Sequence, residues 1–372
     1  MMNTISIDSL AAATPLAKLQ QVADDMAMLR AAVEQSRDLN RADPKIYWPD
    51  FLLSSVLGYG ALALAMMPAL GLWALLAGAV SVLALYRASG FIHELTHIKN
   101  GALPGFRLVW NALVGIPLLV PSFMYEGVHT LHHARTRYGT AEDPEYLPLA
   151  LMTPWSLPAF LGAAAIAPLA LLFRFAVLTP LSLVSPAIRS VVVARYSSLS
   201  INPAFRRRPA EGALRVQWRW QEAGASLWAI GLLALVATGM VPLRLFLIYL
   251  AVVSAIAVLN QVRTLVAHLW ENEGEPMSVT AQYLDSVNVP PPGFLPILWA
   301  PVGLRYHALH HLLPSVPYHN LEEAHRRLVR VLGVESLYHR ANYRSLRGLL
   351  SRLAASTLAS RAPRQRASRA PR

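Results

Sequence analysis

Residues 72–97 read LWALLAGAVSVLALYRASGFIHELTH, and this stretch decides how the rest of the chain must be arranged. Residues 72–86 carry no charge, whereas the end of the stretch carries His93 and His97. A continuous helix from Leu72 to His93 rises roughly 30 Å, about the thickness of the hydrocarbon core of a bilayer. The stretch therefore predicts a membrane-spanning helix that presents two histidines, one turn apart, at a membrane surface.

The composition of the whole chain is typical of a membrane protein. Of its 372 residues, 55% are hydrophobic and only 15% are charged, whereas about a quarter of the residues of a soluble domain are charged. The absence of cysteine excludes a disulfide framework, a thiolate zinc site and a cysteine-ligated iron–sulfur cluster. The net charge of +12 is concentrated at residues 206–208 and 340–372. Beside apolar blocks, this charge indicates a cytoplasmic face near anionic lipid, and not nucleic-acid binding.

Four apolar blocks predict two helical hairpins. Pro68 separates the blocks of the first pair, and Pro242 separates those of the second. The blocks are residues 51–67, 72–86, 226–239 and 245–259. We expect an all-α integral membrane protein with four transmembrane helices in two hairpins, together with interfacial helices.

Two further histidine clusters share the pattern H-x-x-H-H, at residues 129–133 and 307–311. A helix from Val241 to His268 rises about 40 Å, so His268 is expected on the same side as His93. Because each hairpin returns the chain to the face where it began, we expect a histidine-rich metal-binding cap on one side. The basic segments place that side and both termini in the cytoplasm, as in a bacterial inner-membrane protein.

Two other apolar segments, residues 108–121 and 158–184, are expected to be interfacial or re-entrant because each is flanked or interrupted by arginine. The alternative is that one of them spans the membrane. A single crossing there would place the histidine clusters on opposite faces.

Nine imidazoles are too many for one ion and suit two. All-nitrogen coordination favours iron or copper in oxygen chemistry over calcium or magnesium. No catalytic residue beyond the metal ligands and no organic cofactor site is expected. The predicted ligands are His93, His97, His129, His132, His133, His268, His307, His310 and His311.

Other interpretations of the histidines remain open at this stage. Residues 93–97 also match H-E-x-x-H, the helical signature of zinc metalloproteases. That reading leaves both H-x-x-H-H clusters unexplained. A non-catalytic metal-binding protein or transporter is a further alternative, although a transporter needs ionisable residues within its spans. His319 is expected in a loop near the site, and His325 and His339 on the surface.

The pattern resembles the membrane fatty acid desaturase family, whose members are non-haem di-iron enzymes with three histidine boxes. The matching boxes are residues 93–97, 129–133 and 307–311, and the likeness covers roughly residues 48–335. Asp143-Pro144 after the second box and residues 312–321 after the third also resemble the family. Residues 263–268, followed by 271–276, resemble the segment that supplies an extra histidine ligand, here His268. Some relatives have Asn four residues before that histidine, where this chain has Thr264, so Asn260 or Asn272 is a candidate replacement.

The resemblance implies O2-dependent desaturation of a lipid acyl chain at two iron ions. A hydroxylase or ketolase on the same scaffold, acting on a fatty acyl chain, a sphingolipid or a carotenoid, is the alternative. Because the chain has no cysteine and no Rossmann glycine fingerprint, the electrons are expected from a separate ferredoxin- or cytochrome-like donor.

Three regions are predicted along the chain. Residues 1–47 form an N-terminal cytoplasmic amphipathic segment, with a surface helix over residues 16–39 that ends near Pro44. Residues 48–335 form the membrane domain, which ends with an amphipathic helix over residues 321–332. Residues 336–372 form a basic tail that is expected to be disordered.

Overall fold

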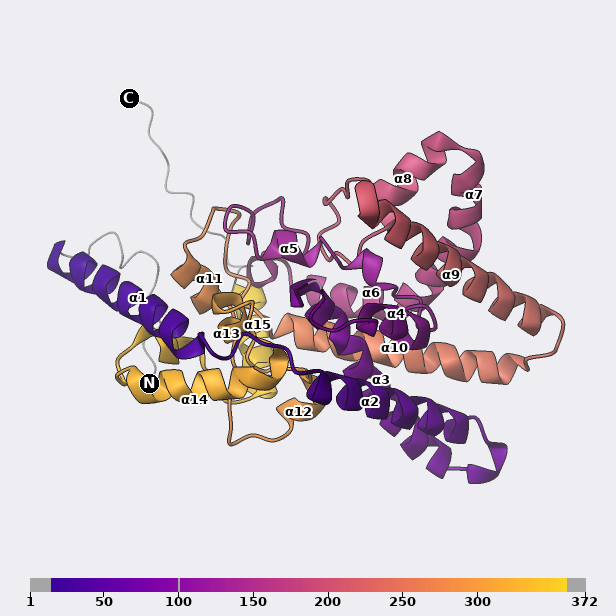
Figure 1. Ribbon diagram of the computed structural model, residues 1–372, viewed down its shortest axis with the longest axis horizontal. Helices are drawn as coiled ribbons and strands as arrows, with labels where there is room; N and C mark the ends of the chain where they lie inside the picture. Colours follow the sequence, from indigo (N-terminus) through magenta and orange to yellow (C-terminus); the bar gives the residue numbers. More distant parts are fainter. Residues whose placement is uncertain (1–14, 100, 360–372) are drawn as a thin grey trace.

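The computed structural model of the protein describes residues 15–99 and 101–359 (Figure 1). These residues form helices joined by loops, with no strand among them beyond isolated β-bridges, so the predicted all-α fold is confirmed. The longer helices are α1 (Pro15–Ser36), α2 (Pro44–Ala65), α3 (Trp73–His97), α6 (Ser156–Phe173), α8 (Pro186–Tyr196), α9 (Gly212–Ala237), α10 (Leu243–Leu265), α14 (Leu321–Val331) and α15 (Leu346–Ala359). The short ones are α4 (Phe106–Trp110), α5 (His129–His132), α7 (Thr179–Val184), α11 (Val279–Asp285), α12 (Pro296–Trp299) and α13 (His307–Leu312).

Both predicted hairpins are present, as α2–α3 and α9–α10, and both project to the same side of the molecule (Figure 1). The carboxylate of Asp43 caps α2 by accepting a hydrogen bond from the Lys45 backbone N–H at 2.8 Å. The turns contain Gly71 and Gly239, whose φ angles of 52° and 75° lie in the left-handed region that favours glycine. The helices include polar residues at their ends and are therefore longer than the predicted apolar blocks.

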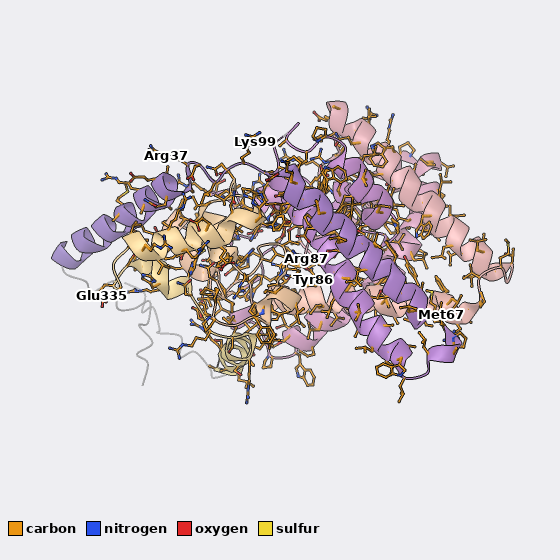
Figure 2. The ribbon with its side chains drawn as sticks, turned by 60° about the horizontal axis from the view of Figure 1, so that its bottom comes forward. Arg37, Met67, Tyr86, Arg87, Lys99 and Glu335 are labelled. Atoms are coloured by element: carbon orange, nitrogen blue, oxygen red, sulfur yellow. The ribbon has the colours of Figure 1, made fainter. Side chains whose placement is uncertain are left out.

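The helix α3 is continuous, so a single element carries both the span and the first histidine cluster, as predicted. Tyr86 and Arg87 lie between the turn at Met67 and the end of α3 near Lys99 (Figure 2). Arg87 forms a two-pronged ion pair with Asp50 of α2, with N···O distances of 2.6 and 2.5 Å. The two helices also approach closely at Gly58, where an added Cβ would lie 2.6 Å from the Leu85 side chain.

Within residues 15–99 and 101–359, five helical segments, not four, are long and apolar enough to cross a membrane. The additional one is Ser156–Val184, which combines α6, a π-helical turn at Arg174–Leu178, and α7. The exact four-span topology is therefore not confirmed. Arg174 does not interrupt this helix because its guanidinium pairs with Glu222 of α9 at 2.6 Å.

The chain nevertheless returns to the histidines after the additional segment, Ser156–Val184. Before α6, the backbone N–H of Ala150 donates to the carbonyl of Trp270, two residues beyond His268. After α8, the N–H of Leu199 donates to the carbonyl of Met124, which precedes the second cluster. Both ends of the α6–α8 region thus lie beside the loops that carry the clusters, and the clusters are not separated.

At the opposite end of the molecule from the hairpin tips, α1 packs against α14 (Figure 1). Met28 and Ala32 of α1 share a hydrophobic core with Leu321, Ala324 and Leu328 of α14. The helices predicted over residues 16–39 and 321–332 are therefore confirmed. They stabilise each other through this shared apolar face.

The expectation of a disordered tail from residue 336 is wrong for the described part of the tail. Leu337, Tyr338 and Ala341 are buried, and α15 buries Leu349 and Leu353. These apolar residues are spaced along an Arg-rich stretch. The basic composition therefore indicated disorder, although the spacing of the apolar residues allows a helix with one buried face. Residues 360–372 lie outside the described residues.

Candidate metal centre

Four elements bring the nine predicted histidines together. The last turn of α3 carries His93 and His97, and the loop after α10 carries His268. The short helices α5 and α13, with the residue that follows α5, carry the two H-x-x-H-H clusters. His319, His325 and His339 lie outside this set.

The nine imidazoles form two groups, in each of which one nitrogen per ring lies within 4.8 Å of all the others. The first group contains five histidines and the second contains four. The first is His93, His97, His129, His133 and His310. The second is His132, His268, His307 and His311.

Each H-x-x-H-H cluster is divided between the two groups. His129 and His133 belong to the first group and His132 to the second, whereas His307 and His311 belong to the second and His310 to the first. Residues four apart share a helix face, so the outer two histidines of each cluster stay together. The middle histidine points to the neighbouring group, and each short helix therefore joins both groups.

Within each group, imidazole nitrogens face one another at short distances. The Nε2 atoms of His129 and His133 are 3.0 Å apart, and those of His268 and His307 are also 3.0 Å apart. Two nitrogens that each bind one ion at about 2.1 Å, at right angles, lie about 3.0 Å apart. Both ring nitrogens of His93 and Nε2 of His97 are buried with no hydrogen-bond partner in the described chain. The arrangement therefore fits one metal ion in each group.

Carboxylates hold the outer nitrogens of two rings. Asp143 accepts from Nδ1 of His132 at 2.9 Å and is itself fully buried. Glu145 lies 3.0 Å from Nδ1 of His129. The Tyr125 hydroxyl contacts both this Nδ1 atom and the Glu145 carboxylate. An imidazole that donates through Nδ1 to a carboxylate directs the lone pair of Nε2 inward, as a metal requires.

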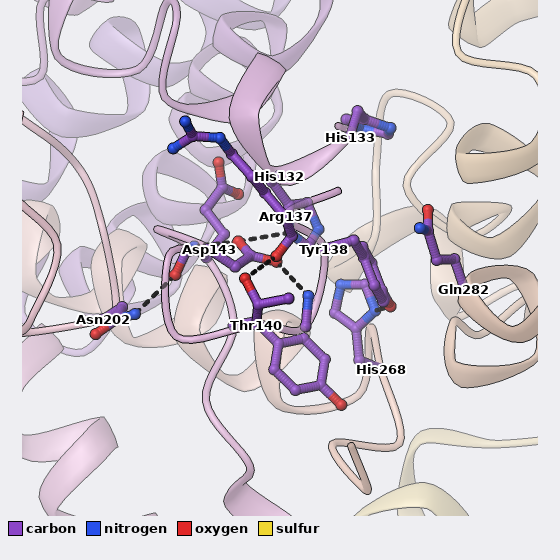
Figure 3. A network of polar contacts seen from close by, with 12 residues as sticks. His132, His133, Arg137, Tyr138, Thr140, Asp143, Asn202, His268 and Gln282 are labelled. Carbon is purple, nitrogen blue, oxygen red and sulfur yellow. Dashed lines mark hydrogen bonds and ion pairs between the residues drawn. The ribbon is translucent and has the colours of Figure 1, made fainter. Parts of the chain in front are cut away.

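A third carboxylate acts on His268 through tyrosine. The hydroxyl of Tyr138 lies 2.8 Å from Nδ1 of His268 and donates to Asp285 at 2.8 Å. Tyr146 also donates to Asp285, at 3.2 Å. Tyr138 and His268 lie next to the His132–Asp143 pair (Figure 3).

The electrostatics of the pocket keep most rings neutral. Burial lowers the pKa of His268 and of His307 well below the usual value, so both offer an unprotonated nitrogen. At His132 burial, the largest single effect, also lowers the pKa, but Asp143, Glu145 and Asp285 together outweigh it and the pKa is raised. Burial raises the pKa of Glu145 to about 7 and that of Asp285 to about 6. These carboxyls are thus costly to ionise until a positive charge is placed beside them.

The sequence did not identify Asp285, Tyr125, Tyr138 or Tyr146. The acids at 143 and 145 were visible shortly after the second cluster, but only as a family likeness. Neither candidate replacement amide belongs to the two groups: Asn272 donates to the carbonyls of Gly139 and Glu275. Asn260 is exposed, and Thr264 donates to its carbonyl. His325 is buried against Tyr338 and is not a surface residue.

The zinc metalloprotease alternative is not supported. A protease of this kind needs the glutamate of H-E-x-x-H as a free general base beside the metal. The carboxylate of Glu94 instead accepts hydrogen bonds from the Tyr47 hydroxyl and from the Tyr318 backbone N–H. Glu94 is buried, and its two hydrogen bonds connect α3 to Tyr47 of α2 and to Tyr318 in the loop after α13.

Comparisons with known proteins agree with this geometry. Residues 68–343 match the family model described as fatty acid desaturase. A relative named ceramide hydroxylase, from Caulobacter vibrioides (strain NA1000 / CB15N), is 49% identical over 327 residues, which cover 87% of this chain and 92% of the relative. No solved structure matches the chain. The chain therefore belongs to the fatty acid desaturase family of membrane di-iron oxidoreductases.

Proposed function

We propose that this protein is a lipid hydroxylase that places a hydroxyl group on a ceramide or a closely related sphingolipid. The observation that carries the proposal is the 49% identity to a ceramide hydroxylase over nearly the whole of both chains. The two groups of imidazoles support it, because each group could hold one metal ion.

The reaction balances with two electrons and two protons from outside. One C–H bond of the lipid becomes a C–OH group, O2 supplies the oxygen atom, and the second oxygen atom leaves as water. The chain has no cysteine to hold an iron–sulfur cluster. A separate ferredoxin- or cytochrome-like protein therefore supplies the electrons.

We infer that the site takes iron, with the nine histidines that form the two groups as its ligands. They are His93, His97, His129, His132, His133, His268, His307, His310 and His311. Neutral imidazoles suit iron, copper and zinc, and the family is one of iron enzymes. Iron, when bound, supplies the activation of O2 that no side chain of this protein can provide.

The remaining residues prepare the site for that chemistry. Asp143 and Glu145 fix the orientation of His132 and His129 through their Nδ1 atoms. The Tyr138 hydroxyl links Asp285 to His268, because it donates a hydrogen bond to the carboxylate and also contacts Nδ1 of His268. Six of the nine histidines are buried, and His97, His133 and His311 are half-buried.

We further propose that the histidine side of the membrane is cytoplasmic. The Arg206–Arg208 stretch follows the return of the chain to that side, where the N–H of Ile201 donates to the carbonyl of Pro144. Positive charge is retained on the cytoplasmic side of membrane proteins. The electron donor would then approach from the cytoplasm, and the lipid from the bilayer.

Desaturation is the second candidate, because the matching family model is described by that activity. Both reactions begin with removal of a hydrogen atom from the lipid chain. They differ in whether oxygen is then transferred or a second hydrogen is removed. Products, not ligands, distinguish the two.

The test is mass spectrometry of lipids from a ceramide-containing host that expresses the wild type, His132→Ala or His339→Ala. We expect lipids with one added oxygen for the wild type and for His339→Ala, which lies outside both groups, and none for His132→Ala. About two irons per purified wild-type chain are expected, with fewer in His132→Ala. Lipids that lack two hydrogens and carry no added oxygen would establish desaturation instead.

A further inference from the structure

A Pro-rich loop between α11 and α13 carries a patch of exposed apolar side chains. Residues 286–304 contain no charged residue, and the short helix α12 lies within them. Four large apolar side chains of this loop are exposed to 71%, 57%, 54% and 45% of their area, and they are Phe294, Leu295, Ile297 and Leu298. A contiguous apolar patch on a protein surface marks an interaction site.

The patch lies at the level where the uncharged part of α3 ends. The Tyr86 hydroxyl donates to the carbonyl of Trp299, the last residue of α12, at 3.1 Å. Tyr86 ends the uncharged stretch 72–86 of α3, and Arg87 follows it. The helix α12 also contacts α10, another segment that is long and apolar enough to span the membrane. In Figure 1 it lies at the base of the hairpin α2–α3, and not near the hairpin tip. The patch therefore continues the outer surface of two spans at the boundary between hydrocarbon and headgroups.

The backbone of this loop suits surroundings that contain little water. The N–H of Ile297 donates to the carbonyl of Phe294 at 3.0 Å. Four of residues 290–296 are proline, which has no N–H to satisfy. The guanidinium of Arg305 donates to the carbonyl of Gly293 at 2.9 Å. Fewer backbone groups would therefore lose a hydrogen-bond partner if the loop left water.

We propose that residues 293–299 insert into the leaflet of the bilayer on the histidine side, with the four exposed apolar side chains among the lipid acyl chains. An amphipathic interfacial segment reaches about 5–10 Å into the boundary between headgroups and acyl chains. A second copy of the chain is a poorer partner, because a stable protein interface takes about 20–30 residues on each side and this patch is one short turn. The insertion does not depend on which reaction the centre catalyses.

The inserted loop is joined closely to the third histidine cluster. Val302 lies between α12 and α13, is buried, and packs against Gly90 of α3, where an added Cβ would lie 3.4 Å from the Val302 side chain. The φ angle of Val302 is 51°, in the left-handed region that a β-branched residue disfavours, so its surroundings must hold it there. Because α13 begins at His307, membrane insertion of the loop holds this cluster close to the bilayer surface.

Fluorescence quenching tests the insertion directly, because the chain has no cysteine of its own. Full-length Phe294→Cys and Leu298→Cys are each labelled with a nitrobenzoxadiazole fluorophore and reconstituted in vesicles of phosphatidylcholine and phosphatidylglycerol. One quencher is a nitroxide on the lipid acyl chains, and the other is iodide on both sides of the membrane. Leu75→Cys is the reference for lipid, since this side chain of α3 is 73% exposed. Val334→Cys is the reference for water, since it is 85% exposed and lies beside Glu335, far from Met67 (Figure 2).

Both loop labels are expected to behave like the label at Leu75→Cys. Their emission should shift to shorter wavelength than that of Val334→Cys, with strong quenching by the nitroxide and weak quenching by iodide. Iodide quenching as strong as in Val334→Cys overturns the proposal. Labels shielded from both quenchers also overturn it, because a protein partner then covers the patch.

A second variant tests whether the apolar side chains cause the insertion. The label is moved to Ile297→Cys, and Phe294→Ser is combined with Leu298→Ser. Iodide quenching of this label is expected to rise toward the value for Val334→Cys. The matched control combines Val331→Ser with Val334→Ser, at side chains that are 52% and 85% exposed, and should leave the label unchanged. A label that stays protected from iodide after both loop substitutions overturns insertion through these side chains.

Discussion

At the scale of single residues, Asp143 and Glu145 contact the outer nitrogens of His132 and His129. Asp143 is fully buried, accepts from His132 and also accepts the backbone N–H groups of Gly139 and Glu145, each at 2.8 Å. Its position is therefore fixed by its own loop before any metal binds. Because Asp143 in turn holds the His132 ring, His132 loses little conformational freedom when it binds a metal ion, and this increases metal affinity.

Asp143→Asn is accordingly expected to weaken metal binding about 10- to 100-fold while the fold is retained. The amide keeps the size of the side chain but loses the charge that supports His132. Competition with an iron chelator measures the affinity, and Glu142→Gln is the control because that neighbouring side chain is 71% exposed. Unchanged iron retention in Asp143→Asn would show that the carboxylate only shapes the loop.

The residues of the site also show what spacing does and does not predict. The eight clustered histidines were predictable because each cluster is local, and helix geometry alone brings residues four apart to one face. The side on which His268 lies was predictable from the length of the helix that precedes it. The division of each cluster between two groups was not, because it depends on how α5 and α13 face each other. Asp285 and Tyr138 are 147 residues apart and belong to no motif. Only folding brings them to His268.

His325 is a titratable residue outside the centre with a direct effect on stability. Its ring is buried and its Nδ1 contacts the Tyr338 hydroxyl at 2.7 Å. Burial, together with nearby His339 and Arg305, lowers its pKa from 6.5 to about 4. Between these values the unfolded chain binds a proton that the folded chain does not. The stability associated with neutral His325 is thus complete above pH 6.5 and is lost as the pH falls through this window.

We therefore expect His325→Gln to lose less stability on acidification than the wild type does. The difference is at most about 1.4 kcal/mol for each pH unit within the window. Thermal unfolding of metal-free protein in detergent, near pH 7 and near pH 5, measures it. His319→Gln, a histidine that does not contribute to the shift at His325, serves as the matched histidine control. Parallel loss of stability in wild type and His325→Gln would mean that His325 is already protonated in the folded protein.

At the scale of helices, a buried ion-pair network determines the course of the chain between the second cluster and α9. Glu222 of α9 pairs with Arg174 and with Arg189, each at 2.6 Å. Arg174 is 3% exposed and also donates to the carbonyl of Tyr196 at 2.9 Å. The network thereby joins the π-helical turn, α8 and α9. Sequence hydropathy treated Arg174 as an interruption because its partner lies 48 residues further along the chain.

Glu222→Ala is expected to destabilise the protein by about 3–5 kcal/mol, since it leaves the Arg174 charge buried without its acid. The double variant Arg174→Met with Glu222→Leu should recover much of this loss, because no charge then remains to be compensated. Unfolding in detergent measures both. Glu323→Ala, which removes an exposed ion pair on α14, is the control and should destabilise the protein far less. A small effect of Glu222→Ala would show that water or lipid compensates Arg174.

At the scale of the whole molecule, convergence of the histidines restricts the topology. Both hairpins must return to one side, and the α6–α8 region must do the same, because its two ends contact Trp270 and Met124. Hydropathy alone could not establish this, since a re-entrant segment and a spanning one have the same composition. The contacts at the ends of the segment, and not its apolar content, show that the chain comes back.

Cysteine labelling tests this topology directly, because the chain contains no cysteine of its own. Single cysteines at Glu142, at Ala204 after α8, and at Met240 in the α9–α10 turn report on three loops. In intact cells an impermeant thiol reagent is expected to label Met240→Cys, which is 74% exposed. The other two should react only after the cells are opened, because they lie with the histidines. Labelling of Ala204→Cys while Met240→Cys stays unlabelled would mean that Ser156–Val184 crosses once, and the second and third clusters could then not share a centre.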